Sequence, residues 1–222
     1  MVGRVLAMGG FEQGRTQLVE LLLELTGKPR PRLVFLPTPA ADGEAWIEFV
    51  RGFAGTNSCE LDVVTLFGTP EKSAARVARA DAVLVSGGNT ANALAVWRVH
   101  GVDRALRDAW AGGAVLGGAS AGANCWFDAS VTDSFGPQLA PLHDGLGLLP
   151  GSFCPHYDGE ELRRPVYTEL VRGGFPAGYA ADDDCALLFE GTELREVVAQ
   201  RQGARAYRVT ADGEQPLEAR LL

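Results

Sequence analysis

Residues 114–126 read AVLGGASAGANCW, and this stretch carries the strongest indication of how the chain folds and acts. Its first three residues are typical of the end of a buried strand. The pentapeptide GASAG at 118–122 is a G-x-S-x-G pattern, and the residues after Ser120 suit the first turn of a helix. The flanking glycines are needed because a Cβ would clash where strand and helix nearly touch. The stretch therefore predicts a nucleophile elbow, with an exposed serine hydroxyl at a tight turn.

The composition indicates a globular enzyme of one domain spanning residues 1–222. The chain is 46% hydrophobic and 22% charged, which are ordinary values, and its length suits a single core. A net charge of −8 disfavours nucleic acid and anionic membranes as partners. No stretch approaches the roughly 18–20 apolar residues that cross a bilayer, so we expect no membrane association.

The cysteines and histidines indicate a cytoplasmic protein without a metal site. The N-terminal MVGRVLAMGGFEQG is interpreted as a first strand and its turn, not as a signal peptide. Four scattered cysteines without C-x-x-C pairing are typical of a reducing compartment. Three histidines without ligand spacing make a zinc site improbable.

Apolar runs alternate with segments of helical period through the first half of the chain. Strands are predicted at Arg4–Met8, Arg32–Leu36, Leu61–Phe67, Ala82–Val85 and up to Leu116. Helices are predicted at Gln17–Leu25, Ala45–Phe53, Pro70–Arg79, Ala91–Val99 and Val102–Trp110. This alternation favours an α/β fold, a mostly parallel central sheet flanked by helices on both faces. Ligands bind such sheets at the carboxyl ends of strands, where both SGGNT (86–90) and GASAG fall.

The second half of the chain has a different character. Asp, Ser, Pro and Gly interrupt every apolar run over 127–150, which we interpret as a loop. A short strand at Ser152–Pro155 and a helix at Arg164–Arg172 follow. Three further C-terminal strands are predicted at Cys185–Phe189, Glu196–Gln200 and Ala206–Thr210.

A serine nucleophile needs a base, and His156 is the best candidate among the three histidines. It follows the strand that ends in SFCP, on the side of the sheet where Ser120 is expected. His100 lies in a helical pattern and His143 in the loop PLHDG, so both are weaker candidates.

The acid that would orient the base is left open among several carboxylates. Asp133 lies in the loop between Ser120 and His156, and Asp182, Asp183 and Asp184 form a run before the strand CALLF. Asp182 and Asp133 are the preferred candidates. At least two members of the acidic run are expected to be ordinary surface charges.

Two backbone amides are candidates for an oxyanion hole. Ala121 follows the nucleophile, and Gly88 lies in a turn that leaves its N–H free at a strand end. The SGGNT turn also suits a helix start capped by Asn89 or Thr90, and both interpretations can hold together.

Two rival chemistries are less well supported. The glycine-rich turns lack the lysine of a P-loop, and MGGFEQG does not fit the dinucleotide fingerprint, so no cofactor is expected. Cys125 as a nucleophile is disfavoured because it lies five residues past the turn, within the helix.

Four motifs together resemble peptidase family S51, the group of aspartyl dipeptidase (peptidase E) and cyanophycinase. They are SGGNT at 86–90, GASAGAN at 118–124, TDS at 132–134 and CPHY at 154–157. The resemblance implies a class I glutamine amidotransferase-like fold with Ser120 as nucleophile and His156 as base. It also implies Gly88 and Ala121 as the oxyanion hole, with Asp133 or Asp182 as the acid.

The resemblance further implies a serine peptidase that hydrolyses short peptides, mainly dipeptides, with N-terminal aspartate as a candidate preference. Asn89, Arg163 and Arg164 are the candidate substrate-binding residues; the segment DGEELRRPVY is shorter than its counterpart in aspartyl dipeptidases. A homodimer is left open. Alternative functions are an esterase or amidase acting on non-peptide substrates and a catalytically silent binding protein.

Overall fold

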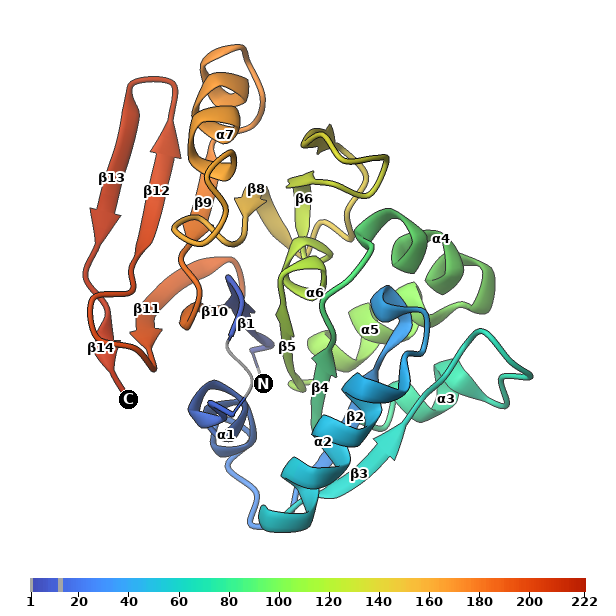
Figure 1. The fold of residues 1–222 in the computed structure, drawn as a ribbon. Helices are drawn as coiled ribbons and strands as arrows, with labels where there is room; N and C mark the ends of the chain where they lie inside the picture. The colour runs from blue at the N-terminus through green and yellow to red at the C-terminus, as the bar shows by residue number, and fades with distance from the viewer. Residues whose placement is uncertain (1, 12–13) are drawn as a thin grey trace.

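A parallel array of five strands forms the centre of the computed structural model, which describes residues 2–11 and 14–222 (Figure 1). Their spatial order is β1 (Arg4–Met8), β5 (Val115–Ala119), β4 (Ala82–Val85), β2 (Arg32–Leu36) and β3 (Glu60–Val63). The sheet also continues on the other side of β1. There the eight-stranded sheet continues through β10 (Cys185–Glu190), β11 (Glu193–Ala199) and β14 (Arg220–Leu221). The predicted α/β class, with a mostly parallel sheet and additional C-terminal strands, is confirmed.

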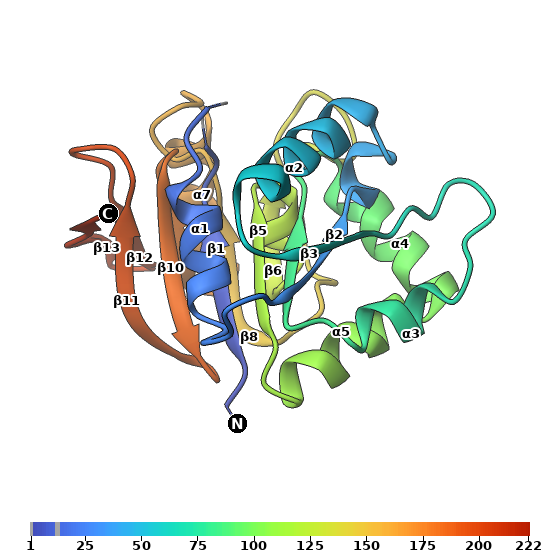
Figure 2. The same cartoon turned by 90° about the horizontal axis from the view of Figure 1, so that it is seen from below.

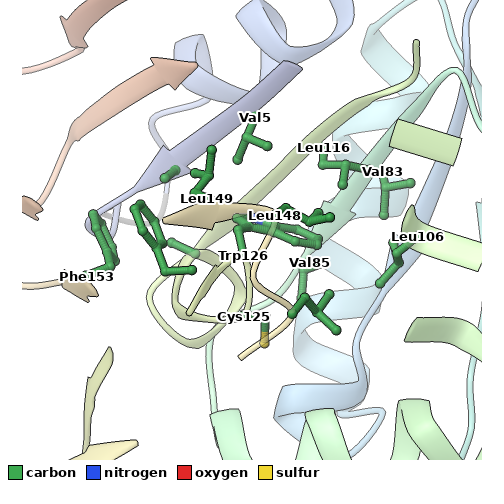
Figure 3. Close-up of a cluster of buried hydrophobic side chains, with 14 of the residues drawn as sticks. Val5, Val83, Val85, Leu106, Leu116, Cys125, Trp126, Leu148, Leu149 and Phe153 are labelled. Atoms are coloured by element: carbon green, nitrogen blue, oxygen red, sulfur yellow. The ribbon is translucent and has the colours of Figure 1, made fainter. Parts of the chain in front are cut away.

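Side chains of this sheet alternate between two cores, because successive residues of a strand point to opposite faces. In β1, Leu6 and Met8 pack against α1 (Gln17–Glu24) and α2 (Glu44–Thr56). Val5 and Ala7 join the opposite core (Figure 3).

The helices on that opposite face are α3 (Ser73–Val77), α4 (Thr90–His100) and α5 (Val102–Ala111). They lie at the far end of the molecule from the hairpin formed by β12 (Ala206–Thr210) and β13 (Gly213–Leu217) (Figures 1 and 2). Helices therefore cover both faces of the sheet, as predicted.

A second sheet of six strands includes part of the region 127–150, for which the sequence predicts a loop. Its order is β13 (Gly213–Leu217), β12 (Ala206–Thr210), β9 (Gly178–Ala181), β8 (Leu149–Cys154), β6 (Phe127–Thr132) and β7 (Ala140–Leu142). The loop prediction for 127–150 is therefore wrong over β6, β7 and the start of β8. Pro141 is tolerated because β7 is an edge strand, where a missing N–H costs little. Helix α7 (Arg163–Arg172) packs on one face of this sheet.

Most predicted elements agree with the structure to within a few residues, and the exceptions have local causes. Strand β3 ends at Val63, four residues before the predicted end. The amides of Leu66 and Phe67 instead donate hydrogen bonds to Asp42 Oδ2, at 2.6 and 2.7 Å. This side-chain acceptor takes the place of a neighbouring strand, so the ladder stops early.

We predict that Leu22→Ala destabilises the protein by about 2–5 kcal/mol, because Leu22 is fully buried where α1 packs on β5. A Cβ on Gly117 would lie 2.8 Å from Leu22 Cδ1, so the two elements touch closely. The matched control is Leu21→Ala in the same helix, where the side chain is only partly buried. Urea denaturation measures both variants; equal losses would contradict the role given to this contact.

Candidate active site

Ser120 occupies a tight turn between β5, which ends at Ala119, and α6 (Ala121–Asn124). Its φ of 55° and ψ of −114° are strained for a residue with a Cβ. A Cβ on Gly118 would lie 2.6 Å from the carbonyl carbon of Gly122, and one on Gly122 would lie 2.6 Å from Val85 O. Both flanking glycines are therefore required by close backbone approach, as the sequence pattern predicts.

The backbone N–H groups of Gly88 and Ala121, beside this turn, have no hydrogen-bond acceptor within the described part of the chain. Gly88 has φ of +131°, and a Cβ there would overlap the carbonyl oxygen of Pro39, so only glycine fits. Its neighbour Gly87 packs on the serine, since a Cβ on Gly87 would lie 3.7 Å from Ser120 Cβ. The turn after β4 and the Ser120 turn are thus adjacent.

Both polar side-chain atoms of Asn89 form hydrogen bonds within the protein. Its Oδ1 caps α4 by accepting from Asn92 N at 2.9 Å, and its Nδ2 donates to Ser134 O at 3.0 Å. Ser134 Oγ also accepts from Ala91 N at 3.2 Å and lies 2.7 Å from Thr132 Oγ1. The TDS stretch is therefore hydrogen-bonded to the start of α4. The helix-cap interpretation of SGGNT is confirmed.

His156 lies two residues past the end of β8, in a left-handed conformation with φ of 53°. Its Nδ1 is 2.6 Å from Oδ1 of Asp183. Its Nε2 has no hydrogen-bond partner among residues 2–11 and 14–222. With Nδ1 protonated and bound to the carboxylate, the lone pair of Nε2 is available to accept a proton.

Neither of the two preferred carboxylates, Asp182 and Asp133, is hydrogen-bonded to His156. Asp182 Oδ2 accepts instead from the amide of Arg205 at 2.9 Å, and Asp133 is exposed on its loop. Asp184 is held by Gln200 Nε2, at 2.8 Å. Since each carboxylate of the run faces a different part of the protein, Asp183 alone of the four candidates contacts the imidazole.

Glycine backbones surround the His156–Asp183 pair. A Cβ on Gly10 would overlap Oδ1 of Asp183 and lie 2.7 Å from Cε1 of His156. A Cβ on Gly159 would overlap Oδ2 of the same carboxylate. Sequence reasoning missed both positions, although the pair Gly9-Gly10 directly after the first strand was a visible signal of close approach.

A second layer of contacts holds the backbone of Asp183. Its N–H donates to Oδ1 of Asp158 at 2.9 Å, and its carbonyl accepts from Arg201 Nη2 at 2.9 Å. Arg201 also pairs with Oδ2 of Asp158 at 2.5 Å. Asp158 and Arg201 thereby position the carboxylate without touching His156, and neither was singled out from the sequence.

Adjacent carboxyl groups in this run have opposite pKa shifts. The hydrogen bond from His156 lowers the pKa of Asp183, with further help from the charges of His156 and Arg201. Burial raises the pKa of Asp182 to about 6, and its Oδ1 has no hydrogen-bond partner in the described structure. Asp183 is therefore ionised at neutral pH, whereas Asp182 holds its proton in mildly acidic solution.

The two candidate arginines already have partners within the protein. Arg163 is 3% exposed, with its guanidinium donating to Glu160 Oε2 at 2.7 Å and to Val131 O at 3.2 Å. Arg164 lies over the rings of Tyr157 and Tyr207, at 4.8 and 4.7 Å from their centroids.

Arg164 also forms an ion pair with Glu214 at 3.4 Å, but its side chain is 45% exposed. It is therefore the more accessible of the two cations. Binding of substrate by Asn89, Arg163 or Arg164 stays a prediction.

Comparison with known proteins decides the family. The model of peptidase family S51 matches residues 5–197. The chain belongs to peptidase family S51. It is 44% identical over 213 residues to the uncharacterized peptidase YgaJ of Bacillus subtilis (strain 168). The aligned residues cover 93% of this chain and 91% of that protein. It is 33% identical over 156 residues to peptidase E of Streptomyces coelicolor, over 69% of this chain and 63% of that protein.

The fold is shared with a solved member of this kind. The crystal structure of a peptidase from an acI-B1 actinobacterium has a TM-score of 0.76, covering 99% of this chain and 95% of that chain at 19% identity. The resemblance to family S51 stated from the four motifs is confirmed. Membership in S51 makes the protein a peptidase, and thus a hydrolase.

Other groups in this S51 peptidase are less suited to chemistry. Cys125 is fully buried, and burial raises the pKa of its thiol far above the usual range, which disfavours it as a nucleophile. His143 is exposed and packs edge-on against Phe175, at 5.1 Å between ring centroids. Within the described ranges, no group of three His, Cys, Asp or Glu side chains is arranged to hold a metal ion. No described helix is long and apolar enough to cross a membrane.

We predict that Asp182→Asn changes how stability depends on pH. The folded protein holds the Asp182 proton up to about pH 6, whereas an unfolded aspartate loses it near 3.8. The contribution of the Asp182 carboxyl to the free energy of unfolding is therefore fully present below about pH 4 and is lost as pH rises to about 6. Across that pH window, the free energy of unfolding of the variant should rise by about 2–3 kcal/mol relative to that of the parent.

The measurement is urea unfolding of parent and variant at several pH values between 4 and 8. Asn retains an oxygen that can accept from Arg205 N, so the local hydrogen bond survives. A constant difference between the two proteins across this range would contradict the raised pKa.

Proposed function

We propose that this S51 peptidase is a serine peptidase that cleaves short peptides, dipeptides among them, near a free N-terminus. Ser120 is the nucleophile, His156 the general base and Asp183 the orienting acid. The observation that carries the proposal is the 2.6 Å contact between His156 Nδ1 and Asp183 Oδ1, which leaves Nε2 free to act.

The position of this pair relative to Ser120 supports the assignment. The amide of Ser120 donates to the carbonyl of Met8, the last residue of β1, at 3.1 Å. Two residues further, Gly10 packs against the ring of His156. The nucleophile and the base thus both adjoin the same end of β1, and the turn at Ser120 has the strained backbone of a nucleophile elbow.

The chemistry follows the serine hydrolase sequence. His156 Nε2 takes the hydroxyl proton as Ser120 Oγ attacks the scissile carbonyl carbon. The developing oxyanion accepts hydrogen bonds from the N–H groups of Gly88 and Ala121. His156 then gives that proton to the leaving amine as the C–N bond breaks, which leaves an acyl-enzyme.

Water hydrolyses the acyl-enzyme by the same steps, giving the acid product and free Ser120. Asp183 stays ionised throughout and stabilises the imidazolium without taking its proton. Its lowered pKa suits this role.

An N-terminal aspartate stays a candidate preference, with Arg164 as the cation that would meet its side chain. Glu214 competes for this guanidinium at 3.4 Å, so a substrate carboxylate would have to displace an existing partner. A strict requirement for aspartate is therefore not part of the proposal.

We predict that Ser120→Ala and His156→Ala each lower peptidase kcat by about 10³–10⁶-fold, since either loss removes the attacking group or its base. Hydrolysis of dipeptides measured by amine release tests this, with circular dichroism to confirm folding. A fluorophosphonate probe should label the parent and fail to label Ser120→Ala. Normal turnover by either folded variant would end the assignment.

We predict that Asp183→Asn lowers kcat by about 10³–10⁴-fold, because the amide no longer stabilises the imidazolium or selects the needed tautomer. Asp182→Asn and Asp133→Asn are matched controls that replace the neighbouring and the alternative carboxylate. Both should retain kcat within about threefold. Loss of turnover in a control with normal activity in Asp183→Asn would reassign the acid.

A further inference from the structure

A cavity of about 190 Å³ opens next to Trp46, whose ring lies near Gly87 in the turn after β4, and the peptidase chemistry proposed above does not use it. It is lined by Phe11, Ala45, Trp46 and Phe49. Phe11 follows the glycine pair at the end of β1, and the others belong to the first turns of α2. No charged side chain of the described residues contributes to this lining. A dry apolar cavity of about 150 Å³ is large enough to bind benzene, so this one can hold an aromatic ring.

Three aromatic rings form the walls and support one another. Phe11 lies 5.8 Å from both Trp46 and Phe49 between ring centroids, and Trp46 lies 6.0 Å from Phe49. The Trp46 ring meets both phenylalanines nearly at right angles, which is a favoured geometry for aromatic pairs. All three residues are only partly buried, so apolar ring surface stays open to an occupant.

Two walls of the cavity connect to the segments that carry the candidate catalytic residues. A Cβ on Gly87 would lie 3.5 Å from Cζ2 of Trp46 and 3.7 Å from Cβ of Ser120, so the ring and the serine flank the same glycine. On the other side, Phe11 directly follows Gly10, whose backbone packs on the ring of His156. A peptide held at Ser120 can therefore place a neighbouring side chain against these rings.

We propose that this cavity is one specificity subsite of the enzyme, separate from Arg164, and binds an aromatic or large aliphatic side chain on one side of the scissile bond. The inference rests on the proposed function, which supplies the scissile bond. None of the described lining side chains would replace the hydration of a carboxylate, so they favour an apolar side chain over an acidic one. Complete burial of a phenylalanine side chain corresponds to about a 10–100-fold gain in kcat/KM over alanine.

The test measures kcat/KM for Ala-Ala, Phe-Ala, Ala-Phe and Asp-Ala. The parent should prefer a phenylalanine dipeptide over Ala-Ala by about 10–100-fold. Trp46→Ala removes a wall and Ala45→Phe fills the space, so both should reduce this preference below about threefold. Phe67→Ala, which removes an exposed phenylalanine outside the lining, is the matched control and should keep the preference.

A binding measurement separates failure of the pocket from failure of the proposed function. Calorimetry with Ser120→Ala should give a Kd at least tenfold lower for the preferred phenylalanine dipeptide than for Ala-Ala, and Trp46→Ala in the same background should abolish this difference. Equal Kd values, or equal kcat/KM values in an active parent, would overturn the pocket. Selective binding without cleavage by the parent would uphold the pocket and overturn the proposed function.

Discussion

The carboxyl end of β1 can hold a histidine–carboxylate pair because Gly9 and Gly10 lack side chains. A Cβ on Gly9 would overlap the carbonyl of Asp182, and a Cβ on Gly10 would overlap the carboxylate of Asp183. The segment that carries Asp183 therefore lies directly against the strand that also binds the Ser120 turn through Met8 O. Any larger residue at these positions would push the acid, and with it the imidazole, away from the serine.

Three residues in the same small region have a strained backbone. Ser120, His156 and Asp184 all have positive φ, at 55°, 53° and 66°, although none is glycine. Such conformations each cost on the order of 1–3 kcal/mol and persist where the surrounding structure determines them. Here the parallel sheet holds Ser120, and the contacts of Asp158 and Arg201 hold the segment of Asp183. The fold thus supports a geometry that local preference opposes.

Neighbouring aspartates show how the environment divides similar groups into different roles. Asp183 has a hydrogen-bonded imidazole and lies near Arg201, so its ionised form is favoured. Asp182 is buried with one unpartnered oxygen, so its neutral form is favoured up to about pH 6. A run of three identical residues carries no local pattern that distinguishes them, because the difference arises from segments far apart in the chain.

Local pattern was sufficient for the strands of the parallel sheet, the turn at Ser120 and the helix start after SGGNT, since hydrophobic period and glycine spacing act over a few residues. Strands β6 and β7 of the second sheet were missed because they carry Asp, Ser and Pro within a short apolar pattern, and pairing with other strands outweighs that composition. The partner of His156 depended on how β8, β9 and the end of β1 pack together. Long-range packing alone could select Asp183 over Asp182 and Asp133, and bring the rings of Phe11 and Trp46 beside Ser120, because no local pattern encodes which segments meet in space.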